Sequence, residues 1–328
     1  MARWSLVGGV LISIALGGPA LALAAADAPL PGKGFSLKEK PGECLDVLLD
    51  GRVAARYMCA YDKSTPKRLH DTNKPYLHVF DAEGKQPITN GPSGLYPHHR
   101  GIFIGWTRLG FEGRSYDFWG MGSGEIVHQK LLDQKAGPDR ATFTSLTHWN
   151  DKAGRTLVVE ERTMAFRRGP AGVRLAIDFT SKLRAPAGDV MLDGDPEHAG
   201  VHYRPANQLD VKKTLYVFPR EKANAKVDLD YPWVGETYTL GNKQYSVVQM
   251  NHPDNPRGTK FSAYRDYGRF GAFFTKTLRS GDSLMVKYRF LVADGEMPRA
   301  AVIQKCWDEH AGASSPSAVP RTSVVPAD

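Results

Sequence analysis

The chain is built of short runs in which apolar and polar residues alternate, separated by turn residues. Ile177 and Phe179 alternate with Asp178 and Thr180, and Val286 and Tyr288 alternate with Lys287 and Arg289. Alternation with a period of two is typical of a β-strand that buries one face. Strands are therefore predicted at 45–49, 53–58, 76–80, 101–109, 125–132, 141–149, 156–166, 174–183, 215–218, 245–250, 270–275 and 284–292.

So many strands predict an all-β fold, because they must close on themselves or stack as two sheets to cover their edges. We expect a large antiparallel β-sandwich with a concave face. Only one helix is predicted, at 298–309 after the last strand, opened by Pro298. No Pro/Ser linker divides the middle of the chain, so residues 27–310 are expected to form a single domain. The tail at 311–328, rich in Ala, Ser and Pro, is expected to be disordered.

Residues 1–26 are typical of a secretory signal peptide. Arg3 precedes an apolar core at 6–16, and small residues around Ala24 offer a cleavage site. Glycines and Pro19 leave the apolar core too short and broken to cross a membrane. We expect a periplasmic or secreted protein whose mature chain has no membrane span.

Charge and cysteine content restrict the partners further. The net charge of +8 is scattered along the chain rather than concentrated, which argues against nucleic acid as a partner. A carboxylated or sulfated substrate stays compatible with this charge, as does a plain solvated surface. Cys44 and Cys59 flank the hairpin turn Asp50-Gly51, so they are candidates for a disulfide, with Cys306 left over.

The first candidate site is the stretch from Pro97 to Gly101, which holds His98, His99 and Arg100 just before an apolar run. Histidine titrates near neutral pH and also binds metals. Adjacent strand residues point to opposite faces, so both histidines reach one ligand only if the backbone bends. Pro97 and Gly101 favour such a bend, and we predict catalytic roles for the histidines and Arg100.

A second polar cluster contains Glu197, His202 and Arg204. Extended geometry from Gly200 onward places His202 and Arg204 on one face of the chain and Tyr203 on the other. A carboxylate, an imidazole and a guanidinium together suit general acid-base chemistry. We therefore predict catalytic roles for Glu197 and His202, with a solvated polar turn as the alternative.

A third cluster places His252 at the end of an apolar strand, followed by Arg265 and Asp266. His252 is predicted as catalytic, and Arg265 and Asp266 as substrate-binding, although the latter two are equally compatible with a surface ion pair. Further substrate contacts are expected from aromatic and polar side chains on which a sugar ring packs and to which it hydrogen-bonds. These residues are Asp117, Trp119, His128 and Tyr203.

Metal binding is a separate hypothesis. His99, His202, His252 and Glu197 are candidate ligands of a divalent cation, because three imidazoles, or two with a carboxylate, are a common ligand set. No H-x-H or H-E-x-x-H spacing supports this, so the cofactor stays unassigned. The sequence also lacks the G-x-S-x-G, phosphate-loop and dinucleotide motifs.

Taken together, several short motifs between about residues 45 and 300 resemble a bacterial family that carries the label "methane oxygenase PmoA". The motifs are Pro75-Tyr76-Leu77-His78, Pro97-His98-His99-Arg100-Gly101, Asp117-Phe118-Trp119, Glu125-Ile126-Val127-His128, Asn251-His252-Pro253-Asp254-Asn255-Pro256, Arg265-Asp266-Tyr267-Gly268 and Leu291-Val292-Ala293-Asp294-Gly295. Where the family usually has Lys-Glu-Gly, this chain has Glu197-His198-Ala199-Gly200. The label conflicts with the sequence, since a methane monooxygenase subunit needs long apolar membrane helices and none follows the signal.

The resemblance implies a secreted sandwich similar to galactose-mutarotase-like proteins, acting on carbohydrate. We hypothesise that a sugar packs on Trp119 while histidines exchange protons with it and an arginine stabilises negative charge. β-Elimination by a lyase is favoured. The alternatives are an epimerase or mutarotase-like enzyme, a glycoside hydrolase, and a glycan-binding module without catalysis.

Overall fold

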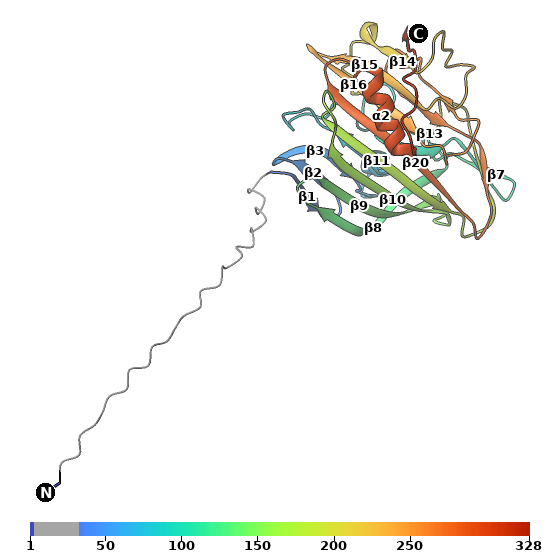
Figure 1. The fold of residues 1–328 in the computed structure, drawn as a ribbon. Helices are drawn as coiled ribbons and strands as arrows, with labels where there is room; N and C mark the ends of the chain where they lie inside the picture. The colour runs from blue at the N-terminus through green and yellow to red at the C-terminus, as the bar shows by residue number, and fades with distance from the viewer. Residues whose placement is uncertain (3–32) are drawn as a thin grey trace. The chain divides into compact units, whose positions relative to one another are not determined.

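Two large antiparallel sheets pack face to face in the computed structural model, which describes residues 1, 2 and 33–328 (Figure 1). Most of the predicted signal peptide lies outside the described residues. The predicted all-β sandwich is confirmed. No helix of the described residues is long and apolar enough to cross a membrane.

The eight-stranded sheet carries the face on which the candidate site lies. Its strands, in spatial order, are β1 (Phe35–Lys40), β2 (Cys44–Leu49), β3 (Arg52–Met58), β4 (Tyr76–Val79), β5 (Gly101–Trp106), β13 (Ala199–Arg204), β18 (Phe270–Phe273) and β17 (Lys260–Phe261). β5 and β13, nearly a hundred residues apart in sequence, pair antiparallel over their full length.

The nine-stranded sheet packs against it. Its strands, in spatial order, are β21 (Ser323–Pro326), β14 (Leu215–Phe218), β15 (Trp233–Leu240), β16 (Lys243–Asn251), β20 (Ser283–Asp294), β11 (Leu175–Arg184), β10 (Thr156–Arg168), β9 (Arg140–Asp151) and β8 (Gly124–Ala136). A four-stranded sheet consists of β19 (Lys276–Leu278), β12 (Val190–Asp193), β6 (Arg108–Phe111) and β7 (Arg114–Tyr116).

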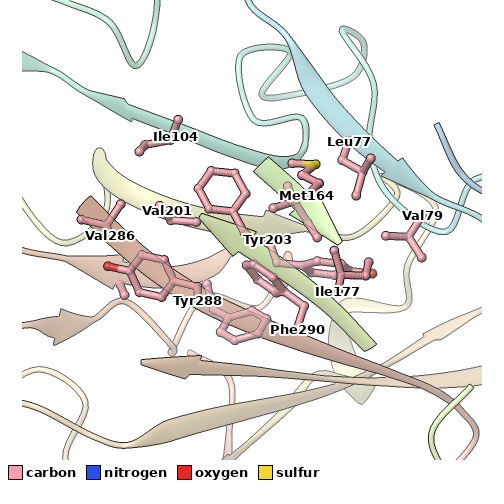
Figure 2. Packing of buried hydrophobic residues seen from close by; sticks show 14 of the residues in the cluster. Leu77, Val79, Ile104, Met164, Ile177, Val201, Tyr203, Val286, Tyr288 and Phe290 are labelled. Carbon is pink, nitrogen blue, oxygen red and sulfur yellow. The ribbon is translucent and has the colours of Figure 1, made fainter. Parts of the chain in front are cut away.

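The main core lies between the two large sheets. Figure 2 shows Val201 and Tyr203 of β13 in one cluster with Ile177, Tyr288 and Phe290 of the nine-stranded sheet. All five side chains are fully buried. Burying large apolar side chains contributes about 1.5–3 kcal/mol each, so this layer holds the two sheets together.

Strand alternation places a second set of side chains on the outer face of the eight-stranded sheet. Ile102 and Ile104 of β5 belong to the main core, whereas Phe103 between them packs with Tyr76 and Trp119 in a separate cluster. Because side chains alternate between the two faces of a strand, β5 contributes Ile102 and Ile104 to the core and Phe103 to the face that carries the candidate site.

The predicted C-terminal helix is present as α2 (Ala300–Ala311), which begins and ends two residues later than expected. It covers the outer face of the nine-stranded sheet, where Ile303 and Cys306 pack against Val248 and Leu291 (Figure 1). Gly312 ends the helix in the left-handed conformation at φ +68°.

Two further helical segments, α1 (Pro66–Thr72) and the 3-10 turn Val211–Lys213, were not predicted. α1 lacks a hydrophobic period but has Thr65 as N-cap, whose hydroxyl accepts from the Arg68 N–H at 3.1 Å. The prediction of a single helix is therefore wrong.

The predicted disordered tail is wrong at its end. Ser323–Pro326 form β21, which pairs antiparallel with β14 at the edge of the nine-stranded sheet. The N–H of Asp328 also donates to the Tyr264 carbonyl at 2.7 Å. A short β-branched run is enough for a strand when an open sheet edge is available, although composition alone does not show that edge.

The predicted disulfide is absent, since Cys44, Cys59 and Cys306 are free buried thiols. Cys44 lies directly opposite Met58 in the β2–β3 register. Cys59 is one residue further along and belongs to the main core, so strand alternation directs the two thiols to opposite faces.

Candidate functional site

The cluster of candidate residues lies on the outer face of the eight-stranded sheet, where β5 and β13 run side by side. Phe103 and His202 are cross-strand partners and both point to this face. Trp119 covers them, with ring centroids 4.7 Å from Phe103 and 4.6 Å from His202. As predicted, His202 and Tyr203 point to opposite faces of β13.

A backbone bend at Gly101 brings His98 and His99 together. Gly101 has φ +48°, and a Cβ there would lie 2.0 Å from the Leu77 carbonyl oxygen, so only glycine fits. The His98 and His99 ring centroids are 4.2 Å apart. The bend expected from Pro97 and Gly101 thus allows two adjacent histidines to border one cavity.

That cavity has a volume of about 280 Å³. It is lined by two aromatic rings, three imidazoles, a carboxylate and a guanidinium, namely Tyr96, His98, His99, Glu197, His198, Arg265 and Tyr267. Drug-sized ligands occupy pockets of about 300–1,000 Å³, so this cavity suits a small polar ligand.

His99 is the least satisfied group in the cavity. Its side chain is 2% exposed, and neither ring nitrogen has a hydrogen-bond partner within the described residues. Its ring lies among Tyr96, Trp119 and Tyr267, with centroids 5.3, 5.6 and 6.1 Å away. Buried polar atoms are normally paired, so a ligand or water is the expected partner.

Both histidines are neutral at physiological pH. Burial and then the nearby Lys74 charge lower the pKa of His98 to about 4. Burial and the Arg269 charge hold the pKa of His99 well below its ordinary value. A neutral imidazole has one nitrogen free to accept a proton, which is what a general base needs.

Glu197 also lines the cavity, as an ionised carboxylate. It accepts two hydrogen bonds from Arg265 at 2.9 and 2.7 Å and one from the Tyr264 hydroxyl at 3.1 Å. Burial alone would raise the pKa of Glu197, but the Arg265 hydrogen bonds and the Arg269 charge outweigh it and lower the pKa. Glu197 thus acts as an anchor for Arg265, rather than as a free acid.

His202, predicted as catalytic, has both ring nitrogens occupied by protein groups. Nε2 lies 2.7 Å from the Ala199 carbonyl oxygen, and Nδ1 lies 3.1 Å from Nη1 of Arg269. The ring is fully buried. His202 therefore positions Arg269 beneath the cavity, and the prediction of direct proton exchange with ligand is not supported.

Arg100 also has a different role from the predicted one. Its guanidinium donates to the backbone carbonyls of Pro97 at 2.8 Å, His70 at 2.6 Å and Asp71 at 3.2 Å. These bonds attach α1 to the loop that precedes β5. With its donors used by backbone carbonyls, Arg100 positions His98 and His99 instead of contacting ligand.

Lys74 is the residue that sequence reasoning missed. It is 1% exposed, donates to the Trp119 carbonyl at 2.6 Å, and lies 4.4 Å above the Phe103 ring. In the part of the chain that the structure describes, no carboxylate forms an ion pair with it. Burial and then the Arg100 charge hold the pKa of Lys74 well below its ordinary value. The only feature of the sequence that could have pointed to Lys74 is its position just before the strand predicted at 76–80.

Asp117 and Trp119 belong to one loop. The Asp117 carboxylate accepts from the N–H groups of Trp119 at 2.9 Å, Gly120 at 2.8 Å and Gly122 at 3.1 Å. Asp117 therefore shapes the loop that holds Trp119, which corrects its predicted role in contacting substrate. The Trp119 indole N–H is buried without a partner among the described residues.

Three predicted site residues lie elsewhere. Tyr203 is in the main core, with its hydroxyl 2.6 Å from that of Tyr238. His128 of β8 lies against Tyr57, 3.4 Å from its hydroxyl. His252 packs on His310 of α2 with ring centroids 5.0 Å apart, on the other sheet. None of the three lines the cavity. Tyr203 is on the same sheet as the site but points to its inner face, whereas His128 lies on a strand of the nine-stranded sheet and His252 directly follows one.

Asp266, the residue after Arg265, makes backbone contacts away from the cavity. Its backbone N–H donates to the Asp328 carbonyl at 3.2 Å, and its own carbonyl accepts from the Thr214 hydroxyl at 2.7 Å. Asp266 thus joins the loop to the chain terminus, and it does not line the cavity. Among the predicted substrate-binding residues, Arg265 lines the cavity and Trp119 lies against His99.

The candidate metal ligands do not assemble. Within the described residues, no three side chains of His, Cys, Asp and Glu lie together as a metal site needs. His252 is on the other sheet, and both nitrogens of His202 are already hydrogen-bonded. The residues present therefore do not fit a divalent cation held as predicted.

A family model described as "Family of unknown function (DUF6807)" matches residues 44–308. None of the curated proteins matches the chain. The label "methane oxygenase PmoA" receives no support from these comparisons.

Several solved structures are similar at low identity. A heparan sulfate lyase HepC mutant from Pedobacter heparinus has 8% identity and a TM-score of 0.39, covering 81% of this chain and 36% of that one. A β-arabinopyranosidase has 10% identity and a TM-score of 0.37, covering 74% and 39%. A GalM/aldose epimerase homologue from C. elegans has 8% identity and a TM-score of 0.32, covering 80% and 99%. The chain thus spans little more than a third of the lyase.

Proposed function

This chain belongs to the family of unknown function DUF6807, and we propose that it is a carbohydrate-active enzyme that removes a proton from a bound sugar. The observation that carries the proposal is His99, a neutral imidazole with two unpaired buried nitrogens that borders a small polar cavity. A buried, unpaired group with a perturbed pKa that borders a cleft is a strong candidate for a general base.

The cavity suits a sugar ring in its composition. Tyr96 and Tyr267 border it, with ring centroids 4.8 Å apart, and Trp119 lies behind His99. Aromatic rings offer apolar faces on which the C–H groups of a sugar pack. Glu197, His198 and Arg265, which also line the cavity, supply acceptors and donors for hydroxyl groups.

β-Elimination is the reaction that these groups support best. His99 takes a proton from the carbon next to a carbonyl or carboxylate, and the electron pair forms a C=C bond as the C–O bond to the neighbouring substituent breaks. The leaving oxygen receives the proton from the His99 imidazolium, directly or through His98, so both histidines return to neutral. Arg265 stabilises the negative charge that develops on the carbonyl oxygen.

Hydrolysis by two carboxylates has less support. Glu197 is the only carboxylate that lines the cavity among the described residues, and it is held by Arg265. The two-carboxylate mechanism needs a second one at a defined separation. Epimerisation begins with the same proton transfer but returns the proton without loss of a substituent, so the product distinguishes the two.

Export to the periplasm or the medium is part of this proposal. It is supported by the apolar segment at 6–16 followed by small residues. Expression of the full chain in a bacterium, followed by mass spectrometry of the secreted or periplasmic protein, is expected to give a mature N-terminus near residue 27. Retention of residues 1–26 on cytoplasmic protein would contradict export.

The enzymatic proposal is tested with the purified protein and a panel of native, oxidised and uronate-containing glycosides. We expect ultraviolet absorbance from a conjugated C=C bond. His99→Gln should lower turnover by roughly 100-fold or more while sugar binding persists. His128→Gln is the matched control, because His128 lies against Tyr57 away from the cavity, and it should keep full turnover.

Two outcomes would overturn the proposal. Wild-type protein that binds sugars without converting any of them would be a glycan-binding module. Full turnover by His99→Gln would show that His99 is not the base.

A further inference from the structure

A second and larger cavity lies near the first. Its volume is about 900 Å³, against about 280 Å³ for the cavity at His99. Uncharged polar side chains are prominent in its lining, including Asn90, Ser93, Gln208 and Asn242. Nothing in the proposed proton transfer uses these residues.

The two cavities share one segment of chain. Asn90 and Ser93 line the larger cavity, whereas Tyr96, His98 and His99 line the smaller one. The segment between residues 90 and 99 therefore contributes to both.

A chain of hydrogen bonds joins their walls. Arg204 is 2% exposed and donates to the Tyr267 carbonyl on the side of the smaller cavity. It also donates to Asn207 Oδ1 at 2.8 Å. Asn207 Nδ2 in turn donates to the Ser93 carbonyl at 2.8 Å and to Asn90 Oδ1 at 2.6 Å, on the side of the larger cavity. Two side chains, Arg204 and Asn207, thus lie between the walls of the two cavities.

The larger cavity is nearly neutral in charge. Asp81 and Glu83 are matched by Lys85 and Lys243, and Lys243 is already paired with Glu83 at 2.9 Å. A polyanion would meet two carboxylates there. An uncharged ligand with many hydroxyl groups meets a balanced set of donors and acceptors.

We infer that the larger cavity binds the uncharged sugar units attached to the sugar at His99, so that the substrate is an oligosaccharide or glycan chain. This inference rests on the proposed function, because it takes the smaller cavity as the site of the reacting sugar. At about 900 Å³ against about 280 Å³, the larger cavity has room for more than one additional sugar unit.

Two substitutions fill the larger cavity without disturbing the core. Gln86 and Gln208 both line it and are exposed, so Gln86→Trp and Gln208→Trp should keep the fold. Gln129→Trp is the matched control, an exposed glutamine on β8 outside both cavities. None of the three residues belongs to the proposed proton-transfer machinery.

The probes are neutral saccharides of one to four units, ending in glucose, galactose, mannose or xylose, with binding measured by calorimetry. We expect the best-bound series to gain at least tenfold in affinity from one unit to three. Each of Gln86→Trp and Gln208→Trp should remove most of that gain without changing the affinity for the single unit, and Gln129→Trp should change neither.

The outcomes separate the two claims. If single sugars bind and added units bring no gain, or if the gain survives both tryptophan variants, the inference about the larger cavity is overturned while the proposed function stands. If no neutral saccharide of any length binds, the inference is overturned, and the proposed function is then decided by the oxidised and uronate-containing glycosides of its own test.

Discussion

Nη1 of Arg269 lies 3.1 Å from Nδ1 of His202, beneath the candidate site. Because a guanidinium has no acceptor, Nδ1 accepts this hydrogen bond and the imidazole proton is on Nε2, which donates to the Ala199 carbonyl at 2.7 Å. Nη1 also donates to the Ser262 hydroxyl at 2.8 Å. Together with a 3.5 Å ion pair from Nη2 to the Glu197 carboxylate, this network fixes the orientation of a fully buried guanidinium.

Replacing Arg269 by Met should destabilise the fold. The variant leaves His202 Nδ1 and the Ser262 hydroxyl without their buried donor, and hydrogen bonds to charged groups contribute about 1.5–3 kcal/mol. We expect the free energy of unfolding, measured with urea, to fall by about 3 kcal/mol. Ser262→Ala should cost only about 1 kcal/mol. Equal losses in the two variants would show that the network is not centred on Arg269.

Replacing Lys74 by Met should leave the fold as stable as the wild type, or about 1 kcal/mol more stable, at pH 7. Lys74 is buried without an ion pair in the described chain, and its folded pKa is lowered mainly by burial. Below a pH of about 10.4, the unfolded chain therefore carries a proton on Lys74 that the folded chain holds less tightly. Wild-type stability rises with pH towards that value, so the advantage of Lys74→Met should shrink.

Urea unfolding of Lys74→Met and wild type at pH 7, 8 and 9 measures this difference. An advantage that grows with pH would contradict a lowered lysine pKa. Lys74→Arg, which keeps a charge that stays protonated, should be less stable than the wild type at every pH.

Replacing Asp117 by Ala should disorganise the loop that carries Trp119. Three backbone N–H groups lose their common acceptor, those of Trp119, Gly120 and Gly122. We expect a loss of about 1.5–3 kcal/mol in unfolding free energy and a weaker near-ultraviolet circular dichroism signal from tryptophan. Asp117→Asn keeps one acceptor oxygen, so its unfolding free energy should lie between those of the wild type and Asp117→Ala. An unchanged tryptophan signal in Asp117→Ala would contradict this positioning role.

Acid should destabilise the protein between pH 6.5 and 4.5, before most carboxylates titrate. Burial lowers the pKa of His98 to about 4 and holds those of His99 and His202 well below the ordinary value. In this range the unfolded chain binds more protons than the folded one, so stability falls as the pH falls. Each histidine contributes up to about 1.4 kcal/mol per pH unit.

The slope of the unfolding free energy against pH measures how many more protons the unfolded chain binds than the folded chain. His98→Gln should reduce it by about one proton, which is about 1.4 kcal/mol per pH unit. Stability that is flat from pH 6.5 to 4.5 would show that the buried histidines already titrate normally in the folded protein.

Two local features at the candidate site agree with the sequence patterns. Alternation placed His202 and Tyr203 on opposite faces of β13, as the structure has them. The glycine at 101 indicated the bend that joins His98 and His99. Both features depend on backbone geometry over a few residues, which sequence carries directly.

Long-range partners could not be predicted in this way. His252 directly follows β16 of the nine-stranded sheet, so it lies against α2 instead of joining the other histidines. Arg100 donates to the backbone carbonyls of Asp71 and His70, which are 29 and 30 residues away in the chain. Lys74 lies against the Trp119 carbonyl across a separation of 45 residues.

By itself the sequence determined that this chain is an all-β sandwich, where most of its strands lie, and which side chains of a strand point away from the core. Only the tertiary structure decided that His98, His99, Glu197 and Arg265 border one cavity while His128 and His252 do not. The reason is that the face of a residue follows from the local period of the backbone. The sheet and the neighbours of its strand depend instead on packing between segments far apart in the chain.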